Sequence, residues 1–223
     1  MVNAHASARQ AGLLPGCRDD VPAISPPISC DDAVGSHMRL CAGVRMILHN
    51  ASCAQLSRLP FLVHVIQTIG LAGDLRGKVI YGRAVAHMIP WGGSRAGLWQ
   101  DPHQIASAML HLGSRLFVER QPLFRYVEVG VFTAWTSCVV AAFLTRAGGG
   151  LPFQGWAVDV QMKNIAPATL TLLKALNVSY VSRGQLDAHL SAPRVAGERP
   201  TRFDLCFIDG DHQVWGGCKR EDA

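Results

Sequence analysis

Apolar residues along this chain follow two periods, one typical of buried strands and one typical of helices. The nearly continuous apolar run at residues 134–144 predicts a helix that is buried on most of its surface. Leucines at helical spacing predict a helix at residues 167–176, and a shorter helical stretch is expected at residues 186–190. Around these lie short runs rich in β-branched and aromatic residues, which predict four strands, at residues 126–129, 153–160, 178–182 and 203–209. Strands that alternate with helices favour an α/β fold, here a Rossmann-like parallel sheet with right-handed crossovers.

The residues before the predicted sheet region follow a different pattern of apolar and polar positions. Residues 1–36 alternate small residues with proline and glycine and show no sustained period, which predicts a disordered or loosely attached segment. Residues 37–73 return to helical spacing on both sides of Pro60, which predicts two amphipathic helices joined near that proline. Residues 73–97 are rich in glycine, with a short predicted strand at residues 78–81. A loop over a ligand site and a plain connector both remain open for this stretch.

A helix start signal marks the boundary with the sheet region. Asp101 can cap free amides, Pro102 suits the first helical position, and Gln104 lies where a capping-box side chain reaches back. We therefore divide the chain into residues 1–36, a helical extension and loop at residues 37–98, and a sheet domain at residues 99–223.

Composition and charge narrow the classes of function. The 223 residues carry a formal net charge of +5, and the basic residues are scattered singly or in loose pairs. Nucleic-acid binding proteins gather such residues into a patch or stripe, so we expect no nucleic-acid partner. The apolar run at residues 129–144 is shorter than the roughly 18–20 residues that cross a bilayer, and a strand signal precedes it, so we expect no membrane partner.

The number and spacing of the cysteines indicate whether the protein occurs in a reducing or an oxidising compartment. Their number is odd, no C-x-x-C occurs, and two of them fall within predicted core elements; they are Cys17, Cys30, Cys41, Cys53, Cys138, Cys206 and Cys218. This pattern argues for a reducing compartment and against a disulfide scaffold or a cysteine-bound zinc. We predict a cytoplasmic location, and the scarcity of acidic residues before Asp19 leaves organellar targeting open.

Polar residues follow the ends of the predicted strands. Gly130 and Thr133 follow the first strand, Asp159 ends the second, Gln185 follows the third, and the cluster at residues 209–212 follows the fourth. Ligands of open parallel sheets bind at the carboxyl ends of the strands, beside the point where the strand order reverses, so these residues predict a site.

Two acidic residues of these strands have specific expectations. A carboxylate at Asp159 can accept both hydroxyls of a ribose, although a helix-capping role remains open. Glu128 lies inside a buried strand, where a carboxylate is costly without a partner, so we expect a ligand or a buried hydrogen bond there. The turn after this strand has only its first glycine, which argues against a pyrophosphate and hence against a nicotinamide-dependent oxidoreductase.

The segments EVGVFTAWTS, WAVDV and FDLCFIDGDH, with the preceding WQDPHQIASAML, together resemble a known family. They are similar to class I S-adenosylmethionine-dependent methyltransferases, in particular the small-molecule O-methyltransferase-like group with an E-x-G turn and an I-D-G-D-H fourth strand. The resemblance covers about residues 99–217. It implies transfer of a methyl group from S-adenosylmethionine to the hydroxyl of a small-molecule acceptor.

The resemblance also implies roles for individual residues. Glu128 and Gly130 would form the turn beneath the methionine part of the cofactor, Asp159 would hold the ribose, and Gln185 would lie near the adenine amino group. The implied cofactor-binding set is Glu128, Gly130, Thr133, Asp159, Gln185 and Asp209.

The end of the fourth strand has two interpretations. By resemblance, Asp209 falls where relatives hold a divalent metal such as Mg²⁺, and His212 falls where they keep a general base. Carboxylate oxygens suit Mg²⁺, and a histidine can accept the proton of an attacking hydroxyl. A plain strand-end turn is the alternative, because Asp-Gly is turn chemistry.

Family members continue beyond the position of His212 with a further helix and three strands. The resemblance therefore implies a C-terminally truncated sheet with strand order 3-2-1-4. Its fourth strand would be an exposed apolar edge, which a second copy of the chain, the N-terminal helices or further chain would cover. A catalytically inactive remnant or interaction module is the alternative to an active methyltransferase.

Overall fold

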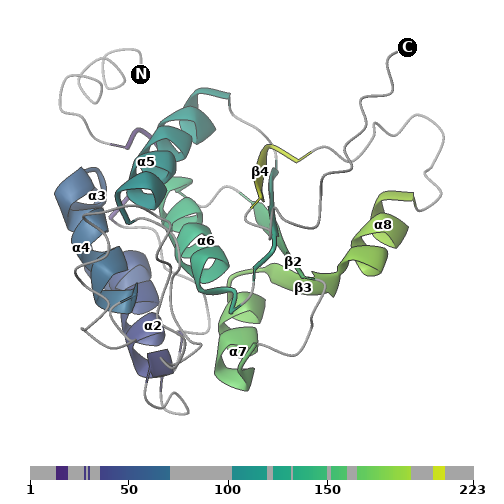
Figure 1. Cartoon of the computed structure of the whole chain (residues 1–223). Helices are drawn as coiled ribbons and strands as arrows, with labels where there is room; N and C mark the ends of the chain where they lie inside the picture. The colour runs from purple at the N-terminus through teal and green to yellow at the C-terminus, as the bar shows by residue number, and fades with distance from the viewer. Residues whose placement is uncertain are drawn as a thin grey trace, which may run out of the picture.

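A four-stranded parallel sheet lies at the centre of the protein, with helices on both of its faces (Figure 1). The structure is a computed structural model, and it describes residues 14–19, 28, 30, 36–70, 102–119, 123–131, 133–149, 152–159, 165–191 and 203–208. The strands are β1 (Phe124–Val129), β2 (Phe153–Asp159), β3 (Val178–Ser182) and β4 (Leu205–Ile208). Their order is β3-β2-β1-β4, which confirms the predicted Rossmann-like α/β fold and the order 3-2-1-4.

The two faces of the sheet have separate apolar clusters because successive side chains of a strand point to opposite faces. Tyr126 on β1 and Ala157 on β2 belong to the main core, on the face that carries most of the helices. Val127, Trp156 and Val158 form a second cluster on the other face. Strands that are buried on both sides are typical of parallel sheets and explain the nearly continuous apolar runs in the sequence.

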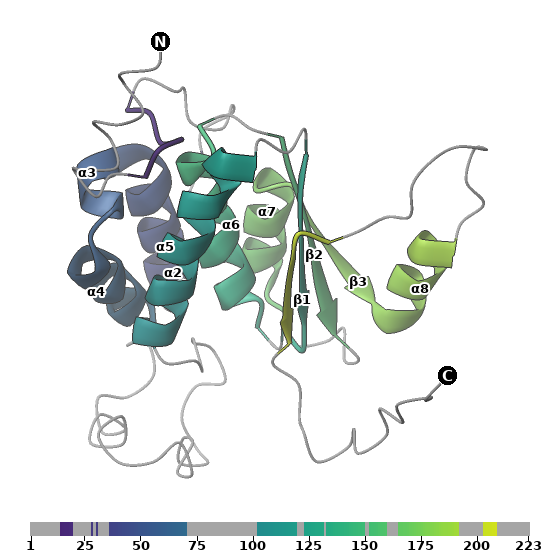
Figure 2. The same ribbon diagram turned by 90° about the horizontal axis from the view of Figure 1, so that it is seen from above.

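The helix α6 (Trp135–Ala147) is the centre of the main core. Twelve of its thirteen residues are buried, so it is apolar around almost its whole circumference, as expected for a helix enclosed by other elements. It contacts the sheet on one side and the N-terminal helices on the other (Figure 2). The sheet and the helical extension therefore share one core.

The helical extension forms an outer layer on α6 (Figure 2). Its elements are α2 (Ser36–Arg45), the π-helical turn η1 (Met46–Asn50), α3 (Cys53–Leu56) and α4 (Leu59–Gly70). Pro60 lies in the first turn of α4, where a missing backbone N–H costs little, so the predicted junction near this proline is a helix start. The short helix α3 was not predicted, although Ser52 and Gln55 form a capping box at its start.

The remaining helices complete the α/β units. Helix α5 (Pro102–Glu119) packs between α4 and α6, α7 (Pro167–Ala175) packs on α6 and β3, and α8 (Arg183–Ser191) covers β2 and β3 from the opposite face (Figure 2). The helix predicted at residues 186–190 therefore begins earlier than expected, at Arg183. The predicted strand at residues 78–81 and the cap at Asp101 lie outside the described residues.

The prediction of reduced cysteines is wrong for four of them. Cys17 is bonded to Cys53, 36 positions away, and Cys30 is bonded to Cys41, 11 positions away. An odd cysteine count and the lack of C-x-x-C cannot reveal such pairs, because packing of distant segments brings the partners together. Among the described cysteines, Cys138 is free and buried and Cys206 is free and exposed.

Part of the predicted loose segment is packed against the core. Within residues 1–36, the described Leu14 and Ile28 are both buried in the main core. Residues 14–19 are tied to α3 by the disulfide from Cys17. Of the helices in the described part of the chain, none is long and apolar enough to cross a membrane.

Candidate functional site

The strand order reverses beside β1, which has β2 on one side and β4 on the other. In doubly wound sheets, ligands bind in a crevice at the carboxyl ends of the strands beside such a reversal. Val129 pairs with Val158 on β2 and with Ile208 on β4, so the three strands end at the same level. Asp159 is the last residue of β2, and Gly130 and Thr133 follow β1, so all three lie at the carboxyl edge of the sheet.

The turn after β1 has two residues in the left-handed backbone region. Gly130 has φ of 86°, which a glycine adopts without steric cost, and its N–H donates to the carbonyl of Val158 at 2.8 Å. Ala134 has φ of 59° immediately before α6. That conformation is costly for an alanine because of its Cβ, and it marks a position suited to glycine. Thr133 lies between them and is buried.

Asp159 ends β2 and is half-buried. It pairs with Ser182 of β3, and it lies on the same face as Ala157. Tyr180 is its neighbour on β3. Burial and, secondarily, the charge of Asp159 raise the pKa of Tyr180 to about 12, so this phenol stays protonated and can donate a hydrogen bond at neutral pH. Tyr180 pairs with Ala157, so the phenol lies two positions before the carboxyl edge, on the same face of the sheet as Asp159.

Gln185 lies in the first turn of α8 and is exposed. Its side-chain oxygen accepts a hydrogen bond from the N–H of Ser182 at 2.7 Å, and its own N–H donates to the Ser182 hydroxyl at 3.3 Å. This reciprocal pair is a capping box. The sequence S-R-G-Q at residues 182–185 has the spacing of a capping box. Gln185 therefore has a structural role in starting α8, in addition to the adenine contact that was predicted for it.

Glu128 fulfils the expectation of a buried carboxylate with hydrogen-bond partners. It is 1% exposed, and its Oε2 accepts hydrogen bonds from the Tyr126 hydroxyl at 2.7 Å and the Ser137 hydroxyl at 2.5 Å. Burial and the neighbouring Glu128 carboxylate raise the pKa of Tyr126 well above its usual value. The cluster joins β1 to α6 below the turn at Gly130, so Glu128 supports the turn from inside the core.

Sequence reasoning missed a histidine at this edge. His37, at the start of α2, lies with its Nδ1 3.3 Å from the hydroxyl of Thr169 and with its ring 5.7 Å from the ring of Trp135. Thr169 and Trp135 belong to the first turns of α7 and α6, which begin on the carboxyl side of the sheet. Burial lowers the pKa of His37. No pattern in the sequence links residues 132 positions apart, so nothing pointed to this group.

Two predicted residues cannot be placed. Asp209 and His212 lie outside the described residues, and the metal and base roles therefore stay predictions. Among the described residues, no group of three or more His, Cys, Asp or Glu side chains could hold a metal ion.

An open pocket of about 510 Å³ lies along α7 and the edge strand β3. It is lined by Leu170, Leu173, Lys174, Asn177, Val178, Ser179 and Tyr180. Of the predicted cofactor residues that the structure describes, none lines it. Tyr180, whose pKa burial and the charge of Asp159 raise, is one of its lining residues.

No protein-family model matches the chain, and comparisons with curated proteins and with solved structures gave no significant match.

Proposed function

We propose that the chain is a methyltransferase-type domain that binds S-adenosylmethionine at the carboxyl edge of β1 and β2 and methylates a hydroxyl of a small-molecule acceptor. One observation carries the proposal. The Gly130 turn and the Asp159 carboxylate lie together at the point where the strand order reverses, joined by the hydrogen bond from Gly130 to the residue before Asp159.

The described residues fit such a cofactor in three respects. Asp159 offers a carboxylate at the end of β2, where a ribose is held in folds of this type. Gly130 keeps side-chain atoms out of the turn. Ala134 stands where the family that the sequence resembles usually has a second glycine, and its left-handed backbone is a conformation that suits glycine.

When bound, S-adenosylmethionine would supply an electrophilic methyl group on a sulfonium, and an acceptor hydroxyl that took this group would have to release its proton to a base. His212 is the base predicted from the sequence. The role of Asp159 is to hold the ribose, and Glu128 supports the turn through Ser137 and Tyr126.

A second candidate is a non-catalytic interaction module. The edge strand β4 favours it, because Ile208 is 68% exposed there and Cys206 is also exposed. Apolar residues on an unpaired strand edge invite association. The module needs no cofactor, so cofactor binding separates the two candidates.

Isothermal titration calorimetry tests the proposal with S-adenosylmethionine and S-adenosylhomocysteine as titrants. We expect wild-type protein to bind both, and Asp159→Asn to lose about tenfold or more in affinity, since a charged hydrogen bond contributes about 1.5–3 kcal/mol. The matched control is Asp187→Asn, which removes an exposed carboxylate whose ion pair with Arg183 lies on the outer surface of α8.

Equal affinities of the Asp159→Asn and Asp187→Asn proteins would reject the assigned site. A folded wild-type protein that binds neither titrant would reject the methyltransferase and leave the interaction module. If both titrants bind, transfer of labelled methyl to candidate hydroxyl compounds identifies the acceptor, and loss of transfer in His212→Ala with binding retained would support the predicted base.

A further inference from the structure

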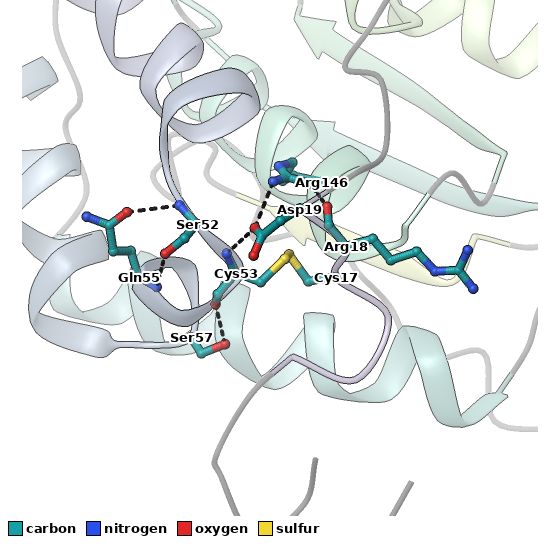
Figure 3. Close-up of polar contacts among 8 residues, drawn as sticks. All are labelled: Cys17, Arg18, Asp19, Ser52, Cys53, Gln55, Ser57 and Arg146. Atoms are coloured by element: carbon teal, nitrogen blue, oxygen red, sulfur yellow. Dashed lines mark hydrogen bonds and ion pairs between the residues drawn. A yellow bond between two sulfur atoms is a disulfide. The ribbon is translucent and has the colours of Figure 1, made fainter. Parts of the chain in front are cut away.

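The segment at residues 14–19, here called the latch segment, lies between α3 and the C-terminal end of α6 (Figure 3). Leu14 is buried in the main core, and its N–H donates to the hydroxyl of Ser57 at 2.8 Å. Cys17 is bonded to Cys53, the first residue of α3. The backbone of Gly16 packs so closely on the turn after α6 that a Cβ at Gly149 would overlap its carbonyl oxygen.

Asp19 joins the latch segment to two helices at once (Figure 3). Its Oδ1 accepts a hydrogen bond from the N–H of Cys53 at 2.8 Å and one from Nη2 of Arg146 at 3.2 Å. The first N–H groups of a helix have no partner within the helix. Ser52 and Gln55 satisfy two donors at the start of α3 through their capping box, and Asp19 satisfies a third.

Arg146 depends on the latch segment for its partners. Its side chain is 7% exposed, Nη1 donates to the carbonyl of Arg18, and Nη2 is paired with Asp19. Its Nε is buried and has no hydrogen-bond partner among the described residues. Burial and the positive charges of Arg45 and Arg146 lower the pKa of the neighbouring His49, so the surroundings of Arg146 are basic. Departure of Asp19 would leave a buried guanidinium uncompensated, which is strongly destabilising.

We propose that the Cys17–Cys53 disulfide is a redox-controlled latch that holds the segment at residues 14–19 closed over α3 and Arg146. The chemistry is thiol–disulfide exchange with a dithiol. A thiolate of the dithiol attacks one sulfur and displaces the other as a thiolate, and the second thiol of the reagent then releases the mixed disulfide. Two electrons and two protons pass to the cysteine pair, and the dithiol becomes a disulfide. Cys17 is the accessible partner, because it is half-buried whereas Cys53 is 8% exposed.

Tryptic cleavage after Arg18 reports whether the latch segment has opened. The carbonyl of Arg18 accepts the hydrogen bond from Arg146, and this carbonyl belongs to the peptide bond that trypsin would cleave. Cleavage therefore requires the segment to leave Arg146. We expect dithiothreitol to accelerate tryptic cleavage after Arg18 about tenfold or more, because proteolysis follows the population of the locally open state. Cleavage after the exposed Arg183 in α8 is the internal standard and should keep its rate.

Two double variants distinguish this latch from a general effect of reduction. Cys17→Ser with Cys53→Ser should be cleaved rapidly after Arg18 with or without dithiothreitol. Cys30→Ser with Cys41→Ser, which removes the other disulfide, should stay protected until dithiothreitol is added. Asp19→Asn keeps the disulfide, and we expect a smaller acceleration than for the Cys17 and Cys53 variant.

Three results would overturn the latch. They are an unchanged rate after Arg18 when the wild-type protein is reduced, alkylation of Cys17 or Cys53 in the unreduced folded protein, and equal rates after Arg18 in the two double variants without reductant. The reduction experiment on wild-type protein remains decisive if the Cys17 and Cys53 variant fails to fold.

Discussion

Glu128 is the residue at which core and site meet. A carboxylate in a buried strand is tolerated only with hydrogen-bond donors, and Tyr126 and Ser137 supply them from β1 and α6. The residue two positions on, Gly130, opens the turn at the carboxyl edge. A change to this cluster is thus expected to loosen α6 and the turn together.

Removing one donor tests this cluster. We expect Ser137→Ala to lower the free energy of unfolding by about 1–3 kcal/mol, because the buried Glu128 carboxyl group loses a hydrogen-bond donor. Ser179→Ala, at an exposed position of β3, should change it by less than about 0.5 kcal/mol. Urea denaturation measures both, and equal values for the two variants would contradict the role given to Ser137.

Ala134 offers a second test at the scale of one residue. Replacing it by glycine relieves a left-handed strain of about 1–2 kcal/mol, while lost methyl burial of about 0.8 kcal/mol and added chain entropy of about 0.5–1 kcal/mol oppose the gain. We therefore expect Ala134→Gly to be nearly neutral. Ala168→Gly, inside α7, lacks the relief and should cost about 1 kcal/mol. Equal losses in urea denaturation would show that Ala134 is unstrained.

His37 makes stability depend on pH. Burial lowers its pKa in the folded protein, so below its unfolded pKa of about 6.5 the unfolded chain binds more protons. The contribution of His37 to stability is therefore fully present above the unfolded pKa and is lost as the pH falls through the lower pKa of the folded protein. We expect Tm to fall between about pH 7.5 and pH 5.5, and His37→Gln to reduce that fall. An exposed control, His111→Gln on α5, allows comparison. An unchanged slope in His37→Gln would exclude this contribution.

Among the helices and strands, some follow from the pattern of their own residues, whereas the packed N-terminal segment depends on contacts with distant parts of the chain. The four strands follow from β-branched and aromatic runs, and the central helix follows from a nearly continuous apolar run. All five occur within a few positions of the prediction. Helices α3 and α8 begin at capping boxes that the sequence contains, at Ser52 and Ser182. The packed residues 14–19 have no periodic signal, because a disulfide and a charge on α6 hold them.

The capping box at the start of helix α8 can be tested by substitution. Ser182→Ala removes the hydroxyl that caps the Gln185 N–H, and we expect a loss of about 1 kcal/mol together with faster hydrogen exchange in the first turn of α8. Gln185→Glu should keep the box, since glutamate serves equally in that position. Exchange in α8 that is unchanged by Ser182→Ala would show that packing on β2 and β3 alone starts this helix.

At the scale of the whole molecule, topology determined what could be foreseen of the site. Parallel strands necessarily bring their carboxyl ends to one edge, so Gly130, Thr133 and Asp159 could be placed together from sequence. The position of His37 could not be predicted from sequence, because this residue reaches that edge through packing of the helical extension on α6 and α7. The disulfides of the extension depend on the same packing and were missed for the same reason.

The edge formed by the turn after β1 and the end of β2 is the place where we propose that a nucleoside-bearing cofactor binds. Hydrogen–deuterium exchange of the wild-type protein with and without millimolar S-adenosylhomocysteine tests this site. We predict slower exchange in peptides that cover residues 128–136 and 157–159. Exchange that is unchanged throughout, or slowed only along α7 and β3 where the open pocket lies, would exclude cofactor binding at this edge.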